Sequence, residues 1–360
     1  MSVDPCSLRA DLHVHSYHSG YAKHLRFLRT RDCYSDPDAV YRVAKARGMD
    51  LVTITDHDSI DGCLEFLSRH PDSDDFFISE EIECSFPGRP LTVHVAAYGI
   101  NERIHREIQR LRANVYETAA YLRSEHLVFS LNHLFFLFAR QMPLEEYLAA
   151  VLPLFPAFET RNGAMLPQHN ALIEATLHAR EAQTGVGHLS ADGRPSTGDG
   201  RLNHPVALVG GSDAHTLRHV GTTYTEAPGR TKAEFLDSLR GGRTRVGGRQ
   251  GSVLRMAADI YGVVFCYWAS LVGALRQDLS CGRRALGLGF SAVSLPAEFV
   301  PLLVAVFAKG GEARRVAAYA REWEAARTTG QTMPDGPERA AHCHPVRRGL
   351  QPAPNHAEPE

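Results

Sequence analysis

The sequence lacks the features that mark secreted, membrane-spanning or nucleic-acid-coating proteins. Its seven cysteines among 360 residues are scattered, with no Cys-x-x-Cys pair, so we expect a reducing, cytoplasmic location and no disulfide framework. The formal net charge of −2 gives no overall attraction to long nucleic acid or to an anionic membrane, so an anionic substrate would have to be held by local charge. The N-terminus, Met-Ser-Val-Asp-Pro-Cys, has no basic stretch followed by an apolar one, and we expect no signal peptide.

Long apolar runs are also missing. The two most apolar stretches, residues 260–274 and 295–308, are shorter than the roughly 20 residues needed to cross a bilayer. We interpret both as buried helices and predict no membrane span.

Short apolar runs alternate with longer amphipathic stretches through the first 250 residues, which is typical of β/α units around a largely parallel sheet. Strands are expected at residues 8–15, 51–55, 91–100, 127–131, 155–159 and 206–210. Helices are expected at residues 37–48 and 103–126, and a surface loop at 183–204. Beyond residue 249 the periodicity is only helical. We therefore predict a catalytic body over residues 1–252, a helical extension over 253–326 and a disordered tail over 327–360.

The sharpest local patterns place side chains that bind metals at alternate positions. His13 and His15 lie two apart in an expected strand, so their side chains share a face and can both reach one metal ion. Asp213 and His215 repeat this spacing after the apolar run 206–210, with a carboxylate oxygen added. The glycines at positions 210 and 211 permit a close backbone approach there. For either pair alone, a chance alternation is the alternative.

Further histidines and a carboxylate occur at the ends of other expected strands, namely His57, Glu81, His94 and His133. Each has an ordinary alternative when taken singly: a helix N-cap around His57, a solvated acidic pair, or a hydrogen-bonded core histidine. Their recurrence at five or more strand ends favours a metal centre, because barrel enzymes place their catalytic groups at strand ends.

On these motifs the sequence resembles the PHP (polymerase and histidinol phosphatase) superfamily over roughly residues 8–250, and stand-alone bacterial members in particular. The matching motifs are Asp-Leu-His-Val-His at 11–15, Ile-Thr-Asp-His-Asp at 54–58, Glu-Glu-Ile at 80–82 followed by Val-His-Val at 93–95, Asn-His at 132–133 and Gly-Gly-Ser-Asp-Ala-His at 210–215. The resemblance implies a distorted (β/α)7 barrel that binds two to three divalent metal ions, Zn, Mn or Fe. It assigns the first metal to His13, His15, Glu81 and Asp213, the second to Glu81, His94 and His133, and the third to His57 and His215.

Two departures from the family pattern concern the third metal and a loop. Many members have Ser-Asp-Gly after the first motif, with the aspartate as a third-site ligand, whereas this chain has Ser19-Gly20-Tyr21. Two neutral imidazoles without a carboxylate attract a divalent cation poorly, so we predict a weak or empty third site unless His18 or His24 substitutes. The middle motif has leucine in place of the usual proline after its histidine, which we expect to alter only loop geometry.

The resemblance implies hydrolysis of a phosphate ester on a small phosphorylated substrate, nucleotides included. Our hypothesis is that a metal-activated water attacks phosphorus while Asp58 protonates the leaving group. Arg161, Arg218 and Arg249 are candidates for contacting the phosphate, with local ion pairs as the alternative. Two other functions stay open: nucleotide phosphatase or exonuclease action on short oligonucleotides, and a non-catalytic, metal-stabilised module that binds a partner. We expect the helical extension to pack on the barrel or to form a homo-oligomer, and do not expect the His-Cys-His cluster at 342–344 to hold metal.

Overall fold

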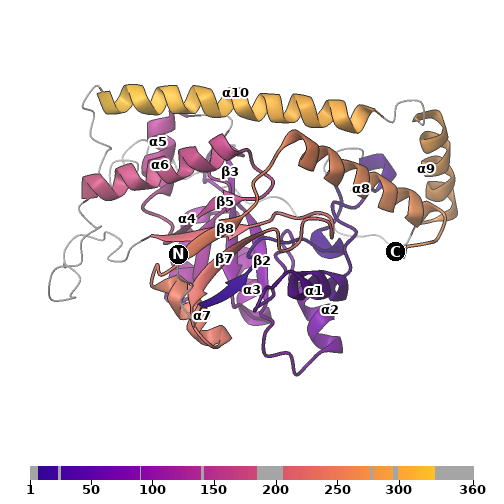
Figure 1. Cartoon of the computed structure of the whole chain (residues 1–360), viewed down its shortest axis with the longest axis horizontal. Coiled ribbons are helices and arrows are strands. Elements are labelled where there is room, and N and C mark those ends of the chain that lie inside the picture. Colours follow the sequence, from indigo (N-terminus) through magenta and orange to yellow (C-terminus); the bar gives the residue numbers. More distant parts are fainter. Residues whose placement is uncertain are drawn as a thin grey trace, which may run out of the picture.

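The computed structural model describes residues 7–22, 26–89, 91–138, 142–184, 206–275, 279–294 and 299–328. Helices surround a central set of strands (Figure 1). The strands are β1 (Ser7–Ala10), β2 (Ser79–Ser85), β3 (Thr92–Tyr98), β4 (Val128–Leu131), β5 (Ala157–Asn162), β6 (Ala207–Gly211), β7 (Thr223–Pro228) and β8 (Arg245–Gly248). The helices are α1 (Pro37–Ala46), α2 (Asp61–Arg69), α3 (Glu102–Leu111), α4 (Val115–Ser124), α5 (Leu144–Val151), α6 (Pro167–Thr184), α7 (Lys232–Arg240), α8 (Val253–Leu271), α9 (Cys281–Ser294) and α10 (Val300–Thr328). Two short 3-10 turns, η1 (Tyr17–Ser19) and η2 (Arg26–Leu28), precede α1.

The described strands form two sheets. Five strands pair in the order β2-β3-β4-β5-β6, with antiparallel pairing from β2 to β4 and parallel pairing from β4 to β6. Three strands form an antiparallel sheet in the order β1-β7-β8. The mixed α/β class is therefore confirmed. A closed ring of strands does not emerge from the pairing of the described residues, and the seven-unit barrel stays a prediction.

The chain between the two sheets is extended but irregular. Residues 8–15 and 51–55 were both expected as strands, yet β1 ends at Ala10 and the rest of these segments forms only isolated parallel bridges, such as Ala10 with Leu51 and Val14 with Ala214. In these segments, side chains form hydrogen bonds that a neighbouring strand would form in a regular ladder. The Val14 amide donates to Thr55 Oγ1 at 3.0 Å, so a regular ladder stops where the polar motif begins.

The predicted long helix over 103–126 is wrong in one respect, because it is two helices, α3 and α4, with a break between them. Asn114 causes the break as an N-cap residue, since its side chain accepts a hydrogen bond from the Tyr116 amide at 3.1 Å. The predicted helix at 37–48 is confirmed as α1. It begins after Asp36, whose side chain accepts a hydrogen bond from the Ala39 amide. It ends before Gly48, a residue with a φ of 80°.

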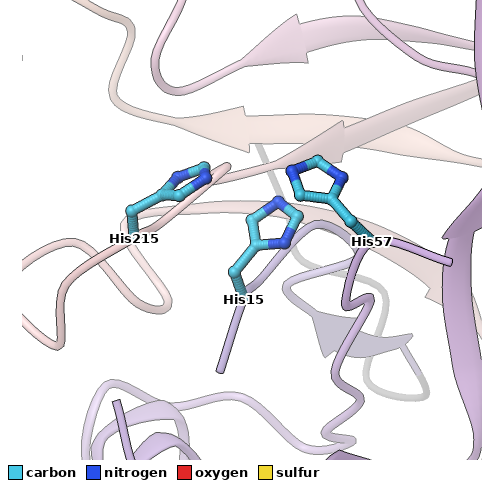
Figure 2. Close-up of side chains that lie close together, drawn as sticks. All are labelled: His15, His57 and His215. Atoms are coloured by element: carbon cyan, nitrogen blue, oxygen red, sulfur yellow. The ribbon is translucent and has the colours of Figure 1, made fainter. Parts of the chain in front are cut away.

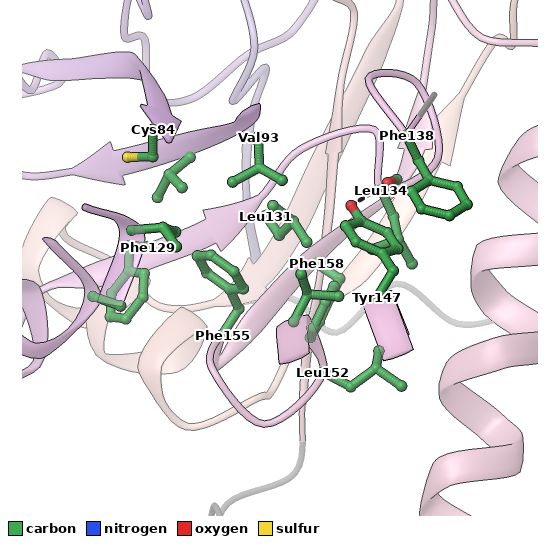
Figure 3. Packing of buried hydrophobic residues seen from close by; sticks show 14 of the residues in the cluster. Cys84, Val93, Phe129, Leu131, Leu134, Phe138, Tyr147, Leu152, Phe155 and Phe158 are labelled. Carbon is green, nitrogen blue, oxygen red and sulfur yellow. Dashed lines mark hydrogen bonds between the residues drawn. The ribbon is translucent and has the colours of Figure 1, made fainter. Parts of the chain in front are cut away.

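The largest hydrophobic core lies between the five-stranded sheet and helices α3 to α6 (Figure 3). Phe129, Phe155 and Phe158 are fully buried in it, and each contributes about 1.5–3 kcal/mol by leaving water. The Tyr147 hydroxyl satisfies its polar group by donating to Leu134 O at 2.7 Å. This core fixes the strands from which the polar site residues project.

Helix α10 lies across the top of the molecule in Figure 1, over α5 and α6 at one end and beside α8 at the other. Val316, Tyr319 and Trp323 of α10 are buried in the large core, and the Tyr319 hydroxyl donates to Phe138 O at 2.6 Å. In the described part of the chain no helix is both long and apolar enough to cross a membrane. Nearly all of the predicted loop 183–204 and tail 327–360, the His-Cys-His cluster and His24 lie outside the described residues.

Candidate metal centre

All eight side chains predicted to bind metal meet where the two sheets adjoin. They come from segments after β1, before α2, on β2 and β3, and after β4 and β6: His13, His15, His57, Glu81, His94, His133, Asp213 and His215. Figure 2 shows the imidazoles of His15, His57 and His215 facing one another, although they come from three separate segments. The His15 ring centroid is 4.5 Å from that of His57 and 4.4 Å from that of His215.

Glu81 lies at the centre of the cluster. Its Oε1 atom is 3.2 Å from a nitrogen of each of three histidines, His13, His94 and His133. Its Oε2 atom is 3.0 Å from His57 Nδ1. A carboxylate surrounded in this way has the geometry to bridge two cations, which is the role expected for Glu81 from the sequence.

Neighbouring Glu80 has a different role. Successive side chains of a strand point to opposite faces, and Glu80 Oε2 accepts hydrogen bonds from His105 Nδ1 at 2.9 Å and Gln109 Nε2 at 3.0 Å on helix α3. The choice of Glu81 over Glu80 as the candidate ligand therefore agrees with the geometry.

The atoms able to bind metal fall into four overlapping groups: His15 with His57 and His215; His13 with His15 and Asp213; His13 with Glu81 and His133; and His57 with Glu81 and His94. Three of the four residues predicted to share the first metal are together in one group. The residues predicted for the second metal are divided, because His94 and His133 contact Glu81 in different groups.

Several buried polar atoms of the cluster have no hydrogen-bond partner among the described residues, and these are His13 Nε2, His15 Nε2, His94 Nδ1 and Glu81 Oε2. Buried polar atoms of native proteins are nearly always satisfied, so atoms left without a partner at one place indicate a missing ligand. Imidazole nitrogens and carboxylate oxygens are the donors that Zn, Mn and Fe accept. The residues present therefore fit divalent metal ions.

Glu159 orients His13 and was missed as a site residue. It accepts from His13 Nδ1 at 2.8 Å, which leaves Nε2 directed at Glu81 and Asp213. The other oxygen of Glu159 accepts from the His133 amide at 3.0 Å and from Asn162 Nδ2 at 2.9 Å. In metal sites, the ring nitrogen of a histidine that does not bind the metal regularly has a hydrogen-bond partner, which fixes the orientation of the ring. The sequence signal for Glu159 was its position at the end of an expected strand, where the candidate ligands also occur.

A second chain of hydrogen bonds orients His15. Its Nδ1 atom is 2.9 Å from Ser19 Oγ, and Ser19 Oγ donates to Asp56 Oδ1 at 2.6 Å. Asp56 also accepts from the amide and hydroxyl of Ser16, each at 2.6 Å. The aspartate of the second motif therefore binds the first motif, and does not act as the helix N-cap considered from the sequence.

Asp32 supplies a carboxylate to the candidate third site, where this chain has Gly20 in place of the aspartate of many PHP members. Its Oδ2 atom is 3.0 Å from His215 Nε2 and 3.4 Å from His57 Nε2. The prediction of a third site with two neutral nitrogens and no carboxylate is therefore wrong in its premise. His18 does not substitute, because its Nε2 atom pairs with Glu65 Oε2 at 2.6 Å.

The charges of this cluster explain its pKa values. Burial would lower the pKa of His57, but the neighbouring Asp32 and Glu81 carboxylates raise it to about 10. Burial opposes protonation of His215 too, yet Asp32 raises that pKa to about 9. Burial and the two neighbouring imidazoles lower the pKa of His15 to about 3. A divalent cation must therefore displace protons from His57 and His215 when it binds.

The backbone at the site is held in uncommon conformations. Asp213 and His133 have positive φ angles of 51° and 30°, a region that non-glycine residues seldom occupy and that is found more often at functional sites. Gly211 packs so closely on His13 that an added Cβ would lie 2.3 Å from His13 Cβ. Close approach at this glycine, expected from the sequence, brings the first and last motifs together.

The four residues predicted to act on substrate are placed less favourably. Asp58 accepts from the Glu83 amide and from Arg112 Nη1, each at 2.9 Å, so its contacts are structural and do not support a role as the acid. Arg161 Nη1 donates to Gly248 O at 3.3 Å. Arg218 and Arg249 are exposed on the loops that follow the last motif and β8. The three arginines therefore stay predicted phosphate contacts.

Helix α8 anchors the loop that carries Asp213 and His215, which the sequence did not predict. Arg255 is buried and donates to Ser212 O. Asp259, one turn later, accepts from Thr216 Oγ1 and His219 Nδ1, each at 2.7 Å. The loop is therefore held on both sides of the ligands by a helix of the predicted extension.

Fold and site together define a mixed α/β protein with a buried cluster of histidines and carboxylates suited to divalent metals. Residues 202–244 match a family model described as PHP-associated. The matched stretch contains the last of the five motifs, so the match agrees with the resemblance of these motifs to the PHP superfamily.

Matches to individual proteins are partial. The chain is 40% identical over 58 residues to an uncharacterized protein of Methanocaldococcus jannaschii, a stretch that covers 16% of this chain and 33% of that relative. Among solved structures it is similar to a Bacteroides vulgatus two-domain protein described as containing a predicted PHP-like metal-dependent phosphoesterase, at 15% identity and a TM-score of 0.43, covering 73% of this chain and 72% of that one. It is also similar to PsfC of Pseudomonas syringae, at 16% identity and a TM-score of 0.44, covering 74% of this chain and 99% of that one. A third similar structure is a lesion-specific endonuclease of Pyrococcus furiosus, at 14% identity and a TM-score of 0.41, covering 84% of this chain and 90% of that one.

Proposed function

We propose that the protein hydrolyses phosphate esters at a centre of two to three divalent metal ions within a PHP-type barrel. The observation that carries this proposal is the group of buried, unpartnered nitrogen and oxygen atoms around the Glu81 carboxylate. Divalent ions bound by these residues would lower the pKa of a bound water, polarise a phosphoryl oxygen and stabilise the leaving oxygen.

The chain's own residues supply position and charge. Glu159 and Ser19 hold the far nitrogens of His13 and His15, so that both Nε2 atoms face the centre. Asp32 adds negative charge at the outer edge, where its side chain is partly exposed. The proposed ligand set is His13, His15, Asp32, His57, Glu81, His94, His133, Asp213 and His215. A phosphate would reach the centre from this exposed edge, with Arg161, Arg218 and Arg249 as proposed contacts.

The test is hydrolysis of p-nitrophenyl phosphate by the purified full chain with added Mn²⁺ or Zn²⁺. We expect activity that Asp213→Ala and His15→Ala each lower by at least roughly 10–100-fold, together with loss of bound metal. The control is His70→Ala, an exposed histidine outside the cluster whose Nε2 atom pairs with Asp38 at 2.9 Å. Near-normal turnover with full metal content in either site variant would overturn the ligand assignment.

The same assay separates an enzyme from a non-catalytic module. No hydrolysis across a panel of sugar phosphates, nucleotides and short oligonucleotides, with metal bound, would favour the module. The identity of the metals, a cytoplasmic location and a homo-oligomer through the helical extension stay predictions.

A further inference from the structure

Asn162 is a buried residue of the site that is absent from the proposed ligand set. It is the last residue of β5, where the parallel pairing with β6 places it opposite Gly211, two residues before Asp213. The pairing continues past the end of β5, because the Gly163 amide donates to Gly211 O at 2.8 Å. None of the Asn162 side chain is exposed to solvent. The register of the two strands therefore fixes this side chain beside the loop that carries Asp213.

A β-bulge in β5 turns Asn162 and Glu159 to the same side. Residues three apart in a regular strand point to opposite faces of the sheet. Between Glu159 and Arg161 the pairing with β6 shifts register, which leaves one extra residue on β5. Asn162 Nδ2 can therefore reach Glu159 Oε2, at 2.9 Å. Bulges recur next to active sites, where they redirect side chains in this way.

The side-chain amide of Asn162 makes all the hydrogen bonds of which it is capable. Its Nδ2 atom donates to two carboxylates, Glu159 Oε2 and, at 3.1 Å, Asp213 Oδ2. Its Oδ1 atom accepts from the Ala164 and Met165 amides, at 2.7 and 3.1 Å. Ionised carboxylates only accept and backbone N–H groups only donate, so these partners allow the amide one orientation. One half of the amide therefore stabilises a turn, and the other half holds two carboxylates.

Through these two carboxylates Asn162 reaches three of the candidate ligands. Asp213 is held directly by its Oδ2 atom, while its Oδ1 atom lies 3.6 Å from His13 Nε2. Glu159 accepts in turn from His13 Nδ1 and from the His133 amide. Asp213 and His133 are also the two candidate ligands with positive φ angles. Such conformations persist only where the surrounding contacts enforce them, and both of these ligands are connected to the same amide.

We propose that Asn162 is a positioning residue of the metal centre, whose Nδ2 group fixes Asp213 directly and His13 and His133 through Glu159. Because Asp213 Oδ2 is engaged by Asn162, Oδ1 is the oxygen that stays directed at the candidate histidine ligands. The donor also lies between two buried carboxylates, which would repel each other without a hydrogen-bond donor to share. The inference rests on the metal centre of the proposed function, but it does not depend on the reaction.

The experiment is titration of the metal-free full chain with Co²⁺, whose visible absorption depends on the number and geometry of its ligands. Asn162→Ser keeps a hydroxyl that can accept from the turn, but a single short hydroxyl cannot donate to both carboxylates. We expect this variant to bind Co²⁺ with an affinity lowered by about 10–100-fold and with an altered absorption spectrum. Asn162→Ala, which loses the turn contact as well, should show at least the same loss.

The matched control is Asn170→Ser, the same substitution at a neighbouring buried asparagine of α6. The side chain of Asn170 forms its hydrogen bonds with the backbone of Asn162 and with Gln250 Oε1. We expect this variant to be less stable in denaturant melts of the metal-free protein, but to bind Co²⁺ as the wild type does. Circular dichroism checks the folding of each variant.

Wild-type affinity and spectrum in a folded Asn162→Ser protein would overturn the proposal. So would an equal loss of affinity in Asn170→Ser, because the effect would then come from packing at the end of β5 in general. A wild-type protein that binds no Co²⁺ would contradict the metal centre itself, and the role of Asn162 with it. Binding of Co²⁺ without hydrolysis of any phosphate ester would contradict the proposed function alone, and the variants would still decide the role of Asn162.

Discussion

Asp32 shows how strongly the centre depends on single side chains. It lies within reach of two histidines that would otherwise face each other, with ring centroids 6.2 Å apart and no carboxylate between them. A carboxylate placed there lowers the cost of bringing a cation to His57 and His215, because it neutralises part of the charge.

We predict that Asp32→Asn removes one metal ion per chain and lowers phosphatase activity by about 10–100-fold, since the amide keeps the shape of the side chain but not its charge. Metal content by plasma mass spectrometry and turnover on the same samples measure this. His18→Ala should retain both metal and activity, because His18 pairs with Glu65 outside the cluster. Loss of a metal in His18→Ala but not in Asp32→Asn would instead favour His18 as the substitute ligand, the alternative considered from the sequence.

Most of the centre could be predicted from the sequence, because the eight candidate ligands lie in contiguous motifs at strand ends. Asp32 could not be found in this way. It lies outside the motifs that carry the other ligands, and only the folding of the chain brings its carboxylate to His215. Glu159 lay on a predicted strand, but it accepts a hydrogen bond from a candidate ligand and is not itself one. Residues of this kind have no characteristic sequence spacing, so the sequence did not single it out.

At the scale of elements, α10 is tied to the body by a buried polar contact. Glu312 Oε1 accepts from the Leu166 amide at 2.7 Å and lies 3.3 Å from His169 Nδ1. Lys309, also buried, donates to Glu312 and to Ala164 O. Residues 164–166 directly follow β5 and Asn162, whose amide group donates to both Glu159 and Asp213. The position of α10 therefore affects how firmly the segment that holds Glu159 and Asp213 is fixed. The apolar periodicity of 253–326 predicted helices here, but the partners of these buried charges depend on tertiary packing.

The pH dependence of this contact is testable. Burial would raise the pKa of Glu312, but hydrogen bonds from His169, Lys309 and the Leu166 amide lower it to about 2. A lowered folded pKa stabilises the protein above the unfolded value of about 4.3, and this contribution is lost as the pH falls toward 2. Glu312→Gln should therefore destabilise the metal-free protein at pH 7 by about 3–5 kcal/mol, since Lys309 loses its buried partner.

The difference in free energy of unfolding between wild type and Glu312→Gln should narrow progressively between about pH 5 and pH 2. Denaturant melts in EDTA measure it, with Glu102→Gln on the exposed face of α3 as the control. A constant difference over this range would show that the carboxylate charge does not stabilise the α10 contact.

Helix α8 gives a second prediction at this scale. A chain that ends at residue 252 loses both Arg255 and Asp259, which hold the loop of Asp213, and it uncovers core otherwise packed on α10. We expect this truncated chain to be insoluble or unable to retain metal. A chain that ends at residue 328 keeps every described contact and should be soluble and active. Soluble, active protein ending at residue 252 would show that the extension is a separate module.

At the scale of the whole molecule, the candidate ligands lie on β2 and β3 of the five-stranded sheet and on the segments that follow β1, β4 and β6 or precede α2. Ions that bind them would connect β1 and its neighbours to the five-stranded sheet, and ligands that bind only the folded state stabilise it by mass action. We therefore predict that EDTA lowers the melting temperature of the wild-type protein. Each ion at about 100 times its dissociation constant contributes about 2.7 kcal/mol, which corresponds to several degrees for a chain of this size.

Calorimetry with EDTA and after adding back Mn²⁺ measures this shift. His15→Ala/Asp213→Ala should show a smaller response, and the exposed variant His70→Ala should respond fully. Identical melting of the wild-type protein with and without chelator would show that the ions do not connect the two sheets.

The contact between the first and last motifs also sets the order in which the molecule can form. Asp11 accepts from the amides of Ser212 and Gly221, each at 2.7 Å, across sequence separations of 201 and 210 residues. Contacts of such long range slow folding, because the chain loses loop entropy before they form. During synthesis the first motif leaves the ribosome long before its partners exist, by roughly 10–40 seconds at about 5–20 residues per second. For that time the histidines of the first motif are exposed on an unfinished chain, and the centre can close only after α8 has emerged to fix the loop of Asp213.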